Sequence, residues 1–295
     1  MKIRKFGKTG IDVSEIGMGC RALGGNEFKN CYGPADDDVS IAAIQKAYEM
    51  GCTFFDTADV FGHGHSEEIL GRALKDVRDK VFICTKVGQD FYAPRPARNF
   101  SPLYTGFALH KSLARLQTDY IDCYFLHNPS IRMIQRGDML EHMSAHKEIG
   151  QIRYYGVSIN KPEEGLAALE VGDPDALQLP YNLIASEGWD ELFRAAKEKG
   201  CAIVAREPLA GGFLTGKYTA ESEFPEGDIR AKIKEKDKIE LARTAAEFKA
   251  KLEIPGEHTL AQAAIKFALE PDAVSVVIPG ARNPEQVAEN LASND

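Results

Sequence analysis

The stretch Cys52–Glu67, CTFFDTADVFGHGHSE, contains an apolar strand that ends at a carboxylate. The apolar run over residues 53–55 stops at Asp56, and a turn rich in Gly and His follows. Acidic side chains are rarely buried without a partner, because removing a charge from water is costly. We therefore expect Asp56 to lie beside a cation that another strand end supplies.

Two later strands end in the same way. The run over residues 81–85 is followed by Lys86, and the run over 121–126 is followed by His127. A lone buried Asp–Lys pair is more often structural than catalytic. Three ionisable strand ends in succession, one of them a histidine, instead favour a functional site made by Asp56, Lys86 and His127.

Strand-like and helix-like segments alternate along the chain. Expected strands cover residues 15–19, 53–56, 81–85, 121–126, 154–158, 176–180, 201–205 and 274–279. Expected helices cover 38–50, 66–76, 106–117, 137–149, 162–170, 189–199 and 258–269, with Asp38 and Ser66 as N-caps of the first two. Eight apolar strands separated by helices predict a closed (β/α)8 barrel, a TIM barrel. Residues 2–16 predict an N-terminal β-hairpin, and no linker interrupts the predicted single domain, 1–295.

Composition excludes several classes of protein. A net charge of −8 argues against a nucleic-acid partner. No apolar run approaches the roughly 18 residues of a membrane span, and the N-terminus lacks the apolar region of a signal peptide. Six cysteines without CxxC spacing predict buried thiols in a reducing cytoplasm. His142 and His146 are four residues apart, but Met143 replaces the glutamate of HExxH, so we expect no metal.

The chain resembles bacterial aldo-keto reductases from end to end. The resemblance rests on KFGKTGIDVSEIGMG, DTAD, GHGHSEEILGRAL, the TK and LH strand ends, LQLPYN, PLAGGFLTGKY and IPGARNPEQVAEN, in this order. It implies a (β/α)8 barrel that uses NADP(H), without metal or flavin, to reduce a small carbonyl substrate: an aldehyde, a ketone or a sugar. It also implies a catalytic tetrad of Asp, Tyr, Lys and His, of which Asp56, Lys86 and His127 match three members.

The fourth member differs, because Phe61 stands where the family has tyrosine. The tyrosine hydroxyl protonates the developing alkoxide, and general-acid catalysis contributes roughly 10²–10⁴-fold to the rate. Three interpretations follow. Phe61 is an engineered replacement that traps a complex; or it is native, with His127 or an ordered water as the acid; or it marks a sensor that binds NADPH without turnover.

The resemblance also assigns cofactor and substrate positions. Ser158 and Gln178 are expected to hold the carboxamide, and Arg282 the 2′-phosphate. Arg206 either stacks on the nicotinamide, as aromatic residues do in many relatives, or pairs with Glu207 at the rim. Further expected cofactor contacts are Gly19, Cys20, Leu209, Gly211, Gly212, Gly216, Lys217, Gly280, Gln286, Glu289 and Asn290.

Four side chains are expected to line the substrate pocket: Arg21, Phe91, Tyr92 and Asn128. Arg21 stands where many relatives carry an aromatic residue. With Arg206 it makes the mouth cationic, which favours a substrate that bears a carboxylate or a phosphate. The sequence makes no prediction of the oligomeric state.

Overall fold

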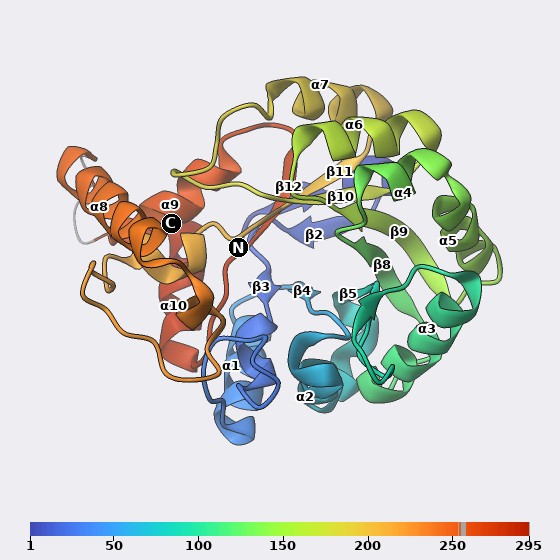
Figure 1. Cartoon of the computed structure of the whole chain (residues 1–295), viewed down its shortest axis with the longest axis horizontal. Helices are drawn as coiled ribbons and strands as arrows, with labels where there is room; N and C mark the ends of the chain where they lie inside the picture. Colours follow the sequence, from blue (N-terminus) through green and yellow to red (C-terminus); the bar gives the residue numbers. More distant parts are fainter. Residues whose placement is uncertain (253, 255–257, 295) are drawn as a thin grey trace.

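The computed structural model describes residues 1–252, 254 and 258–294. Eight parallel strands form its central sheet (Figure 1). In their order around the sheet they are β3 (Met18–Gly19), β4 (Phe54–Asp56), β5 (Phe82–Val87), β8 (Ile121–His127), β9 (Ile152–Ser158), β10 (Ala176–Pro180), β11 (Ala202–Arg206) and β12 (Val274–Ile278). Residues 253, 255–257 and 295 of the predicted single domain lie outside the described chain.

Backbone bonds join the first and last strands of this sheet. The amide of Gly17 donates to the Val277 carbonyl over 2.8 Å, and the amide of Gly19 donates to the Pro279 carbonyl over 3.0 Å. These bonds close the sheet on itself, and closure leaves few strand edges unpaired. The predicted (β/α)8 barrel is confirmed.

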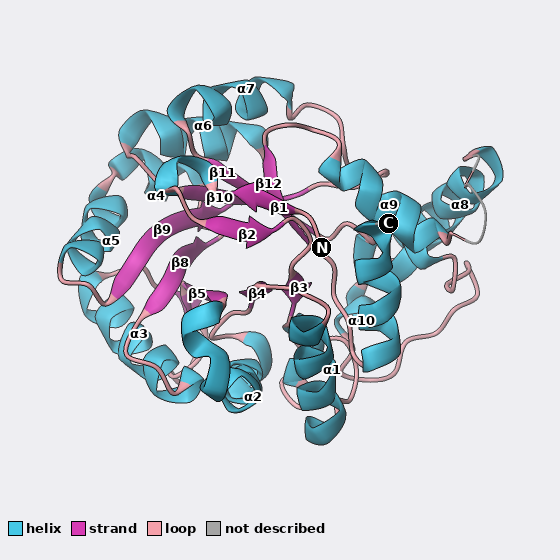
Figure 2. Ribbon diagram, turned by 180° about the vertical axis from the view of Figure 1, so that it is seen from behind, coloured by secondary structure: helices cyan, strands magenta, loops and turns pink. Residues whose placement is uncertain are grey.

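Helices surround the strands (Figure 2). They are α1 (Asp37–Glu49), α2 (His65–Leu74), α3 (Pro102–Leu116), α4 (Ile131–Arg136), α5 (Asp138–Glu148), α6 (Pro162–Val171), α7 (Asp190–Lys199), α8 (Glu235–Lys251), α9 (Leu260–Leu269) and α10 (Pro284–Leu291). Neither α4 nor α8 is predicted from the sequence. No helix within the described residues is both long and apolar enough to cross a membrane.

The N-caps of the first two helices differ from the prediction. The side chain of Asp36, not Asp38, accepts a hydrogen bond from the Val39 amide and caps α1. Ser66 lies inside α2, where its hydroxyl donates to the Cys20 carbonyl over 2.8 Å. Ser66 therefore ties α2 to the first strand end instead of capping the helix.

The N-terminal hairpin, β1 (Ile3–Lys5) and β2 (Asp12–Ser14), covers one end of the barrel interior. Phe6 is fully buried between its strands, and its ring centroid lies 4.8 Å from that of Phe82 and 5.8 Å from that of Phe54. Gly7 follows with a φ of +53°, and a Cβ there would lie 2.4 Å from the Gly200 carbonyl oxygen. Only glycine allows this close approach, so the hairpin plugs the N-terminal end of the barrel.

Candidate active site

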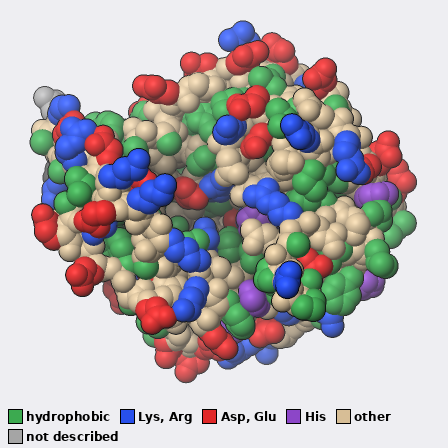
Figure 3. Space-filling view, viewed as in Figure 1, with side chains coloured by type: hydrophobic (Ala, Val, Ile, Leu, Met, Phe, Trp, Pro, Cys, Tyr) green, Lys and Arg blue, Asp and Glu red, His purple; other side chains and the backbone are tan. Residues whose placement is uncertain are grey.

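A cavity of ≈ 510 Å³ opens where the strands end at their carboxyl termini. Figure 3 shows a hollow on this face, with Lys and Arg side chains gathered around it. The strand ends supply one wall with Asp56, Lys86 and His127. In barrels of this type, active sites lie at this end of the strands.

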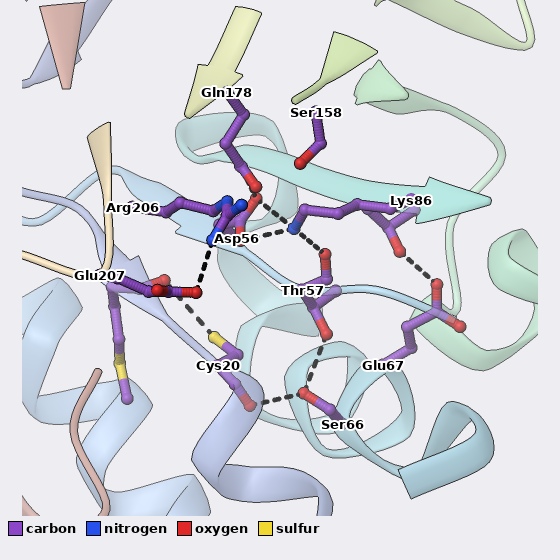
Figure 4. A network of polar contacts seen from close by, with 12 residues as sticks. Cys20, Asp56, Thr57, Ser66, Glu67, Lys86, Ser158, Gln178, Arg206 and Glu207 are labelled. Atoms are coloured by element: carbon purple, nitrogen blue, oxygen red, sulfur yellow. Dashed lines mark hydrogen bonds and ion pairs between the residues drawn. The ribbon is translucent and has the colours of Figure 1, made fainter. Parts of the chain in front are cut away.

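Lys86 and Asp56 form a buried ion pair in this wall (Figure 4). The Lys86 ammonium donates to Asp56 Oδ1 over 2.7 Å, to Oδ2 over 2.6 Å and to the Thr57 carbonyl over 2.6 Å. Gln178 Nε2 also donates to Asp56 Oδ1, over 2.7 Å. The Lys86 and Asp56 side chains are only 2% and 6% exposed. All three ammonium protons are thus engaged, and the pair is fixed in position.

His127 ends β8 in the same cavity. Burial is the main cause that lowers its pKa well below the ordinary value, and the positive charges of Lys86 and Arg21 lower it further. The imidazole is therefore neutral at pH 7. A neutral ring can donate a hydrogen bond to a carbonyl oxygen through whichever nitrogen carries the proton.

Phe61 begins the 3-10 helix η3 (Phe61–Gly64) and is buried against the same groups. Its ring lies edge-on to His127 with centroids 6.0 Å apart, and Lys86 Nζ is 5.5 Å from its centroid. The next residue, Gly62, has a φ of +61°, and a Cβ there would lie 2.1 Å from the Gly24 carbonyl oxygen. The backbone therefore fixes the Phe61 ring beside the ion pair, although the ring itself offers no proton.

Behind this wall lies a second group of buried acids. Glu67 accepts from the Thr85 hydroxyl over 2.5 Å and pairs with Arg115 at 2.6 Å. Among the described residues, both carboxyl oxygens of Asp59 are buried without a hydrogen-bond partner. Burial and the nearby Glu67 raise the pKa of Asp59 well above its usual value. We therefore expect Asp59 to keep its proton at neutral pH.

The sequence model of the Aldo/keto reductase family matches residues 15–295. The chain belongs to this family. Family membership makes the protein a carbonyl-reducing oxidoreductase, and the resemblance noted from the motifs is confirmed.

Named relatives and a solved structure are consistent with membership of this family. The chain is 30% identical to the uncharacterized oxidoreductase YqkF of Bacillus subtilis, over 99% of this chain and 90% of YqkF. It is 32% identical to the aldo-keto reductase yakc [NADP(+)] of Schizosaccharomyces pombe, over 97% and 85%. The holo form of aldo-keto reductase AKR11C1 from Bacillus halodurans superposes with a TM-score of 0.81 at 29% identity, covering 100% of this chain and 91% of that one.

Most of the residues expected to bind cofactor line the cavity. They are Gly19, Cys20, Gln178, Arg206, Leu209, Gly211, Gly212, Lys217, Gly280, Arg282, Gln286, Glu289 and Asn290. Ser158 and Gly216 are not in the lining. The Ser158 hydroxyl instead donates to Asn128 Oδ1 over 2.8 Å. Asn128 lines the cavity, so Ser158 lies one hydrogen bond away from it.

Arg206 makes the ion pair that the sequence offered as one of two alternatives. Its Nη1 lies 2.5 Å from Glu207 Oε1, and its Nη2 donates to Asn160 Oδ1 over 2.7 Å. The guanidinium therefore lies fixed at the rim of the cavity.

Phe91 and Tyr92 lie outside the cavity lining. The Phe91 ring stacks on His63 at a centroid distance of 4.6 Å and on Tyr92 at 4.3 Å, and His63 stacks in turn on Phe28 at 3.9 Å. The Tyr92 hydroxyl accepts from Arg115 over 2.7 Å. These rings join three loops beside the cavity instead of facing into it.

Several lining residues have no counterpart in the sequence prediction, among them Tyr32, Tyr218 and Arg230. Arg230 pairs with Asp228 at 2.6 Å and donates to the Tyr218 hydroxyl over 2.7 Å. Burial raises the pKa of Tyr32, which keeps its hydroxyl protonated. Tyr32 lies far in the chain from Tyr218 and Arg230, and no local spacing predicts that it meets them.

Proposed function

We propose that this aldo-keto reductase uses NADPH to reduce an aldehyde, a ketone or a sugar. The observation that carries the proposal is the buried Asp56–Lys86 pair in the wall of a cavity that also holds His127. A fixed cation beside a neutral imidazole provides electrostatic stabilisation for negative charge that develops on a carbonyl oxygen.

The opposite part of the cavity has the chemistry that a dinucleotide needs. Gly211 has a φ of +67° and open space on the side where a Cβ would lie, so its backbone can approach a phosphate. Lys217 and Arg282 line the same cavity; neither forms an ion pair within the described part of the chain, and Arg282 Nη2 donates to the Pro34 carbonyl. These residues fit the pyrophosphate and the 2′-phosphate of NADP(H). When bound, NADPH supplies the hydride.

The chain's own residues then have separate tasks. His127 orients the carbonyl oxygen. Lys86 provides positive charge near that oxygen but keeps its protons, because all three N–H groups of its ammonium are already engaged in hydrogen bonds. Gln178 secures Asp56, and in the family pattern it also meets the carboxamide. The proton for the alkoxide comes from an ordered water, since Phe61 has none to give and a neutral His127 would be left as an imidazolate if it gave up its own.

A second function is supported by Phe61 itself. A chain that binds NADPH tightly but lacks the usual acid could act as a sensor, with cofactor state gating a partner contact. All six cysteines are free and buried, which supports our proposal of a reducing cytoplasm.

The deciding experiment compares NADPH oxidation by this chain and by Phe61→Tyr on a small carbonyl panel, with NADH in parallel. A gain of about a hundredfold or more indicates a reductase that lacks its acid. Equal activity in the two proteins means that the proton does not come from residue 61 and that a water is the acid. If neither protein turns over while NADPH binding stays tight, the reductase proposal fails and the sensor replaces it.

A further inference from the structure

Four cations act on the pKa of His127, and two of them lack a carboxylate partner among the residues that the structure describes. The four are Lys86, Arg21, Arg206 and Arg98. Lys86 pairs with Asp56 and Arg206 pairs with Glu207. Within the described chain, neither of the other two, Arg21 and Arg98, has an ion-pair partner. The site therefore holds more positive charge than the protein itself balances.

Of these two, Arg21 lines the cavity and Arg98 does not. Its Cζ is 5.2 Å from the centroid of the Phe61 ring and 5.6 Å from that of Tyr32, and it lines the same cavity as His127. Its Nε donates to the Asn30 carbonyl over 3.0 Å. This bond fixes the stem of the guanidinium. In the described part of the chain, its terminal nitrogens Nη1 and Nη2 have no hydrogen-bond partner.

A half-buried guanidinium that is held by Nε and free at both terminal nitrogens is prepared for a bidentate contact with an oxyanion. Arg206, which lines the same cavity, also has a buried Nε without a partner among the described residues. Burial strengthens a charge-assisted bond, because water competes less for the partners. A ligand that supplies negative oxygen here satisfies donors that the folded chain leaves unused.

We propose that Arg21 binds an anionic group on the substrate, so that the enzyme prefers carbonyl compounds bearing a carboxylate or a phosphate near the reacting carbon. This inference rests on the proposed reductase function and narrows its substrate class. Arg21 is separate from the residues that we assign to the cofactor phosphates, namely Gly211, Lys217 and Arg282. It should therefore govern substrate choice and leave the affinity for NADPH unchanged.

The test uses matched substrates that differ in charge. Butanal is compared with 4-oxobutanoate, and glyceraldehyde with glyceraldehyde 3-phosphate; the two pairs distinguish a carboxylate from a phosphate. We expect kcat/KM to favour at least one anionic member, and Arg21→Gln to lower that preference about 10- to 100-fold, as for the loss of a hydrogen bond to a charged group. Arg136→Gln, at an exposed position in α4 paired with Asp138, is the matched control and should leave the preference unchanged.

A binding measurement separates this inference from the reductase proposal. Succinate and methyl phosphate are titrated calorimetrically into the NADPH complex, with butanamide as the neutral comparison. We expect an anion to bind at least about tenfold more weakly to Arg21→Gln, and Arg21→Lys to keep part of the affinity. Absence of turnover with anion binding intact rejects the reductase but keeps the anion site. Equal anion binding by wild type and Arg21→Gln, or weaker NADPH binding by the variant, overturns the anion site.

Discussion

Among the ion pairs of the described residues, the Asp56–Lys86 pair should lose the most unfolding free energy when one member is removed. Lys86→Met keeps an unbranched side chain one atom shorter than lysine but leaves the Asp56 carboxylate buried with Gln178 as its remaining side-chain donor among the described residues. Asp56→Asn leaves the ammonium buried without its counter-charge. Because both side chains are under a tenth exposed, we expect each single variant to lose about 3–5 kcal/mol of unfolding free energy. That is a large part of the about 5–15 kcal/mol typical of a folded protein.

A double-mutant cycle measured by urea unfolding at pH 7 checks this. The double variant Asp56→Asn/Lys86→Met should lose less than the two single losses added together, because it removes both members of the pair. Lys5→Met is the control: Lys5 pairs with Asp12 at 2.8 Å, but these side chains are 64% and 59% exposed, and its loss should be about 1 kcal/mol or less. If the single variants lose no more unfolding free energy than Lys5→Met, or if their losses add without coupling, burial does not make this ion pair important for stability.

Two further predictions concern pH. The folded chain keeps His127 neutral while the unfolded chain binds a proton below about pH 6.5, so unfolding free energy should fall as the pH drops through that value. His127→Gln should reduce this fall, whereas His110→Gln at an exposed position of α3 should not; equal slopes contradict the assignment. The raised pKa of Asp59 acts in the opposite direction, since stability is lost as the pH rises above the unfolded value of about 3.9. Asp59→Asn should therefore raise Tm at pH 8 more than at pH 4, and a lower Tm at pH 8 refutes a buried protonated acid.

The barrel and the ion pair follow from short-range patterns. Each strand is a short apolar run. Asp56, Lys86 and His127 can be predicted as site residues because each is an ionisable residue that ends such a run. Helix α8 could not be predicted in this way, because Ala242 and Ala245 are its only buried residues among those described, and two small side chains give no apolar stripe.

The loops at the cavity were harder to predict. Their directions depend on partners far away in the chain: Ile229 donates its amide to the Cys31 carbonyl over 2.9 Å, which brings Tyr32 and Arg230 to one cavity. Phe91 was expected to face the substrate because it follows a strand end. Its ring instead stacks on His63, a contact that no spacing within its own loop encodes.

The hairpin that plugs the barrel has a consequence for how this enzyme can change during evolution. Phe6 and its neighbours close the N-terminal end, while the residues that would meet cofactor and substrate stand on loops at the other end. A substitution such as one at Arg21 can therefore alter which molecule is accepted without disturbing the packing that holds the fold together. Selection on the packing of the plugged end and selection on the cavity loops act on opposite ends of the same barrel, so loop residues such as Arg21 can change while the Asp56–Lys86 pair and the plugged end stay as they are.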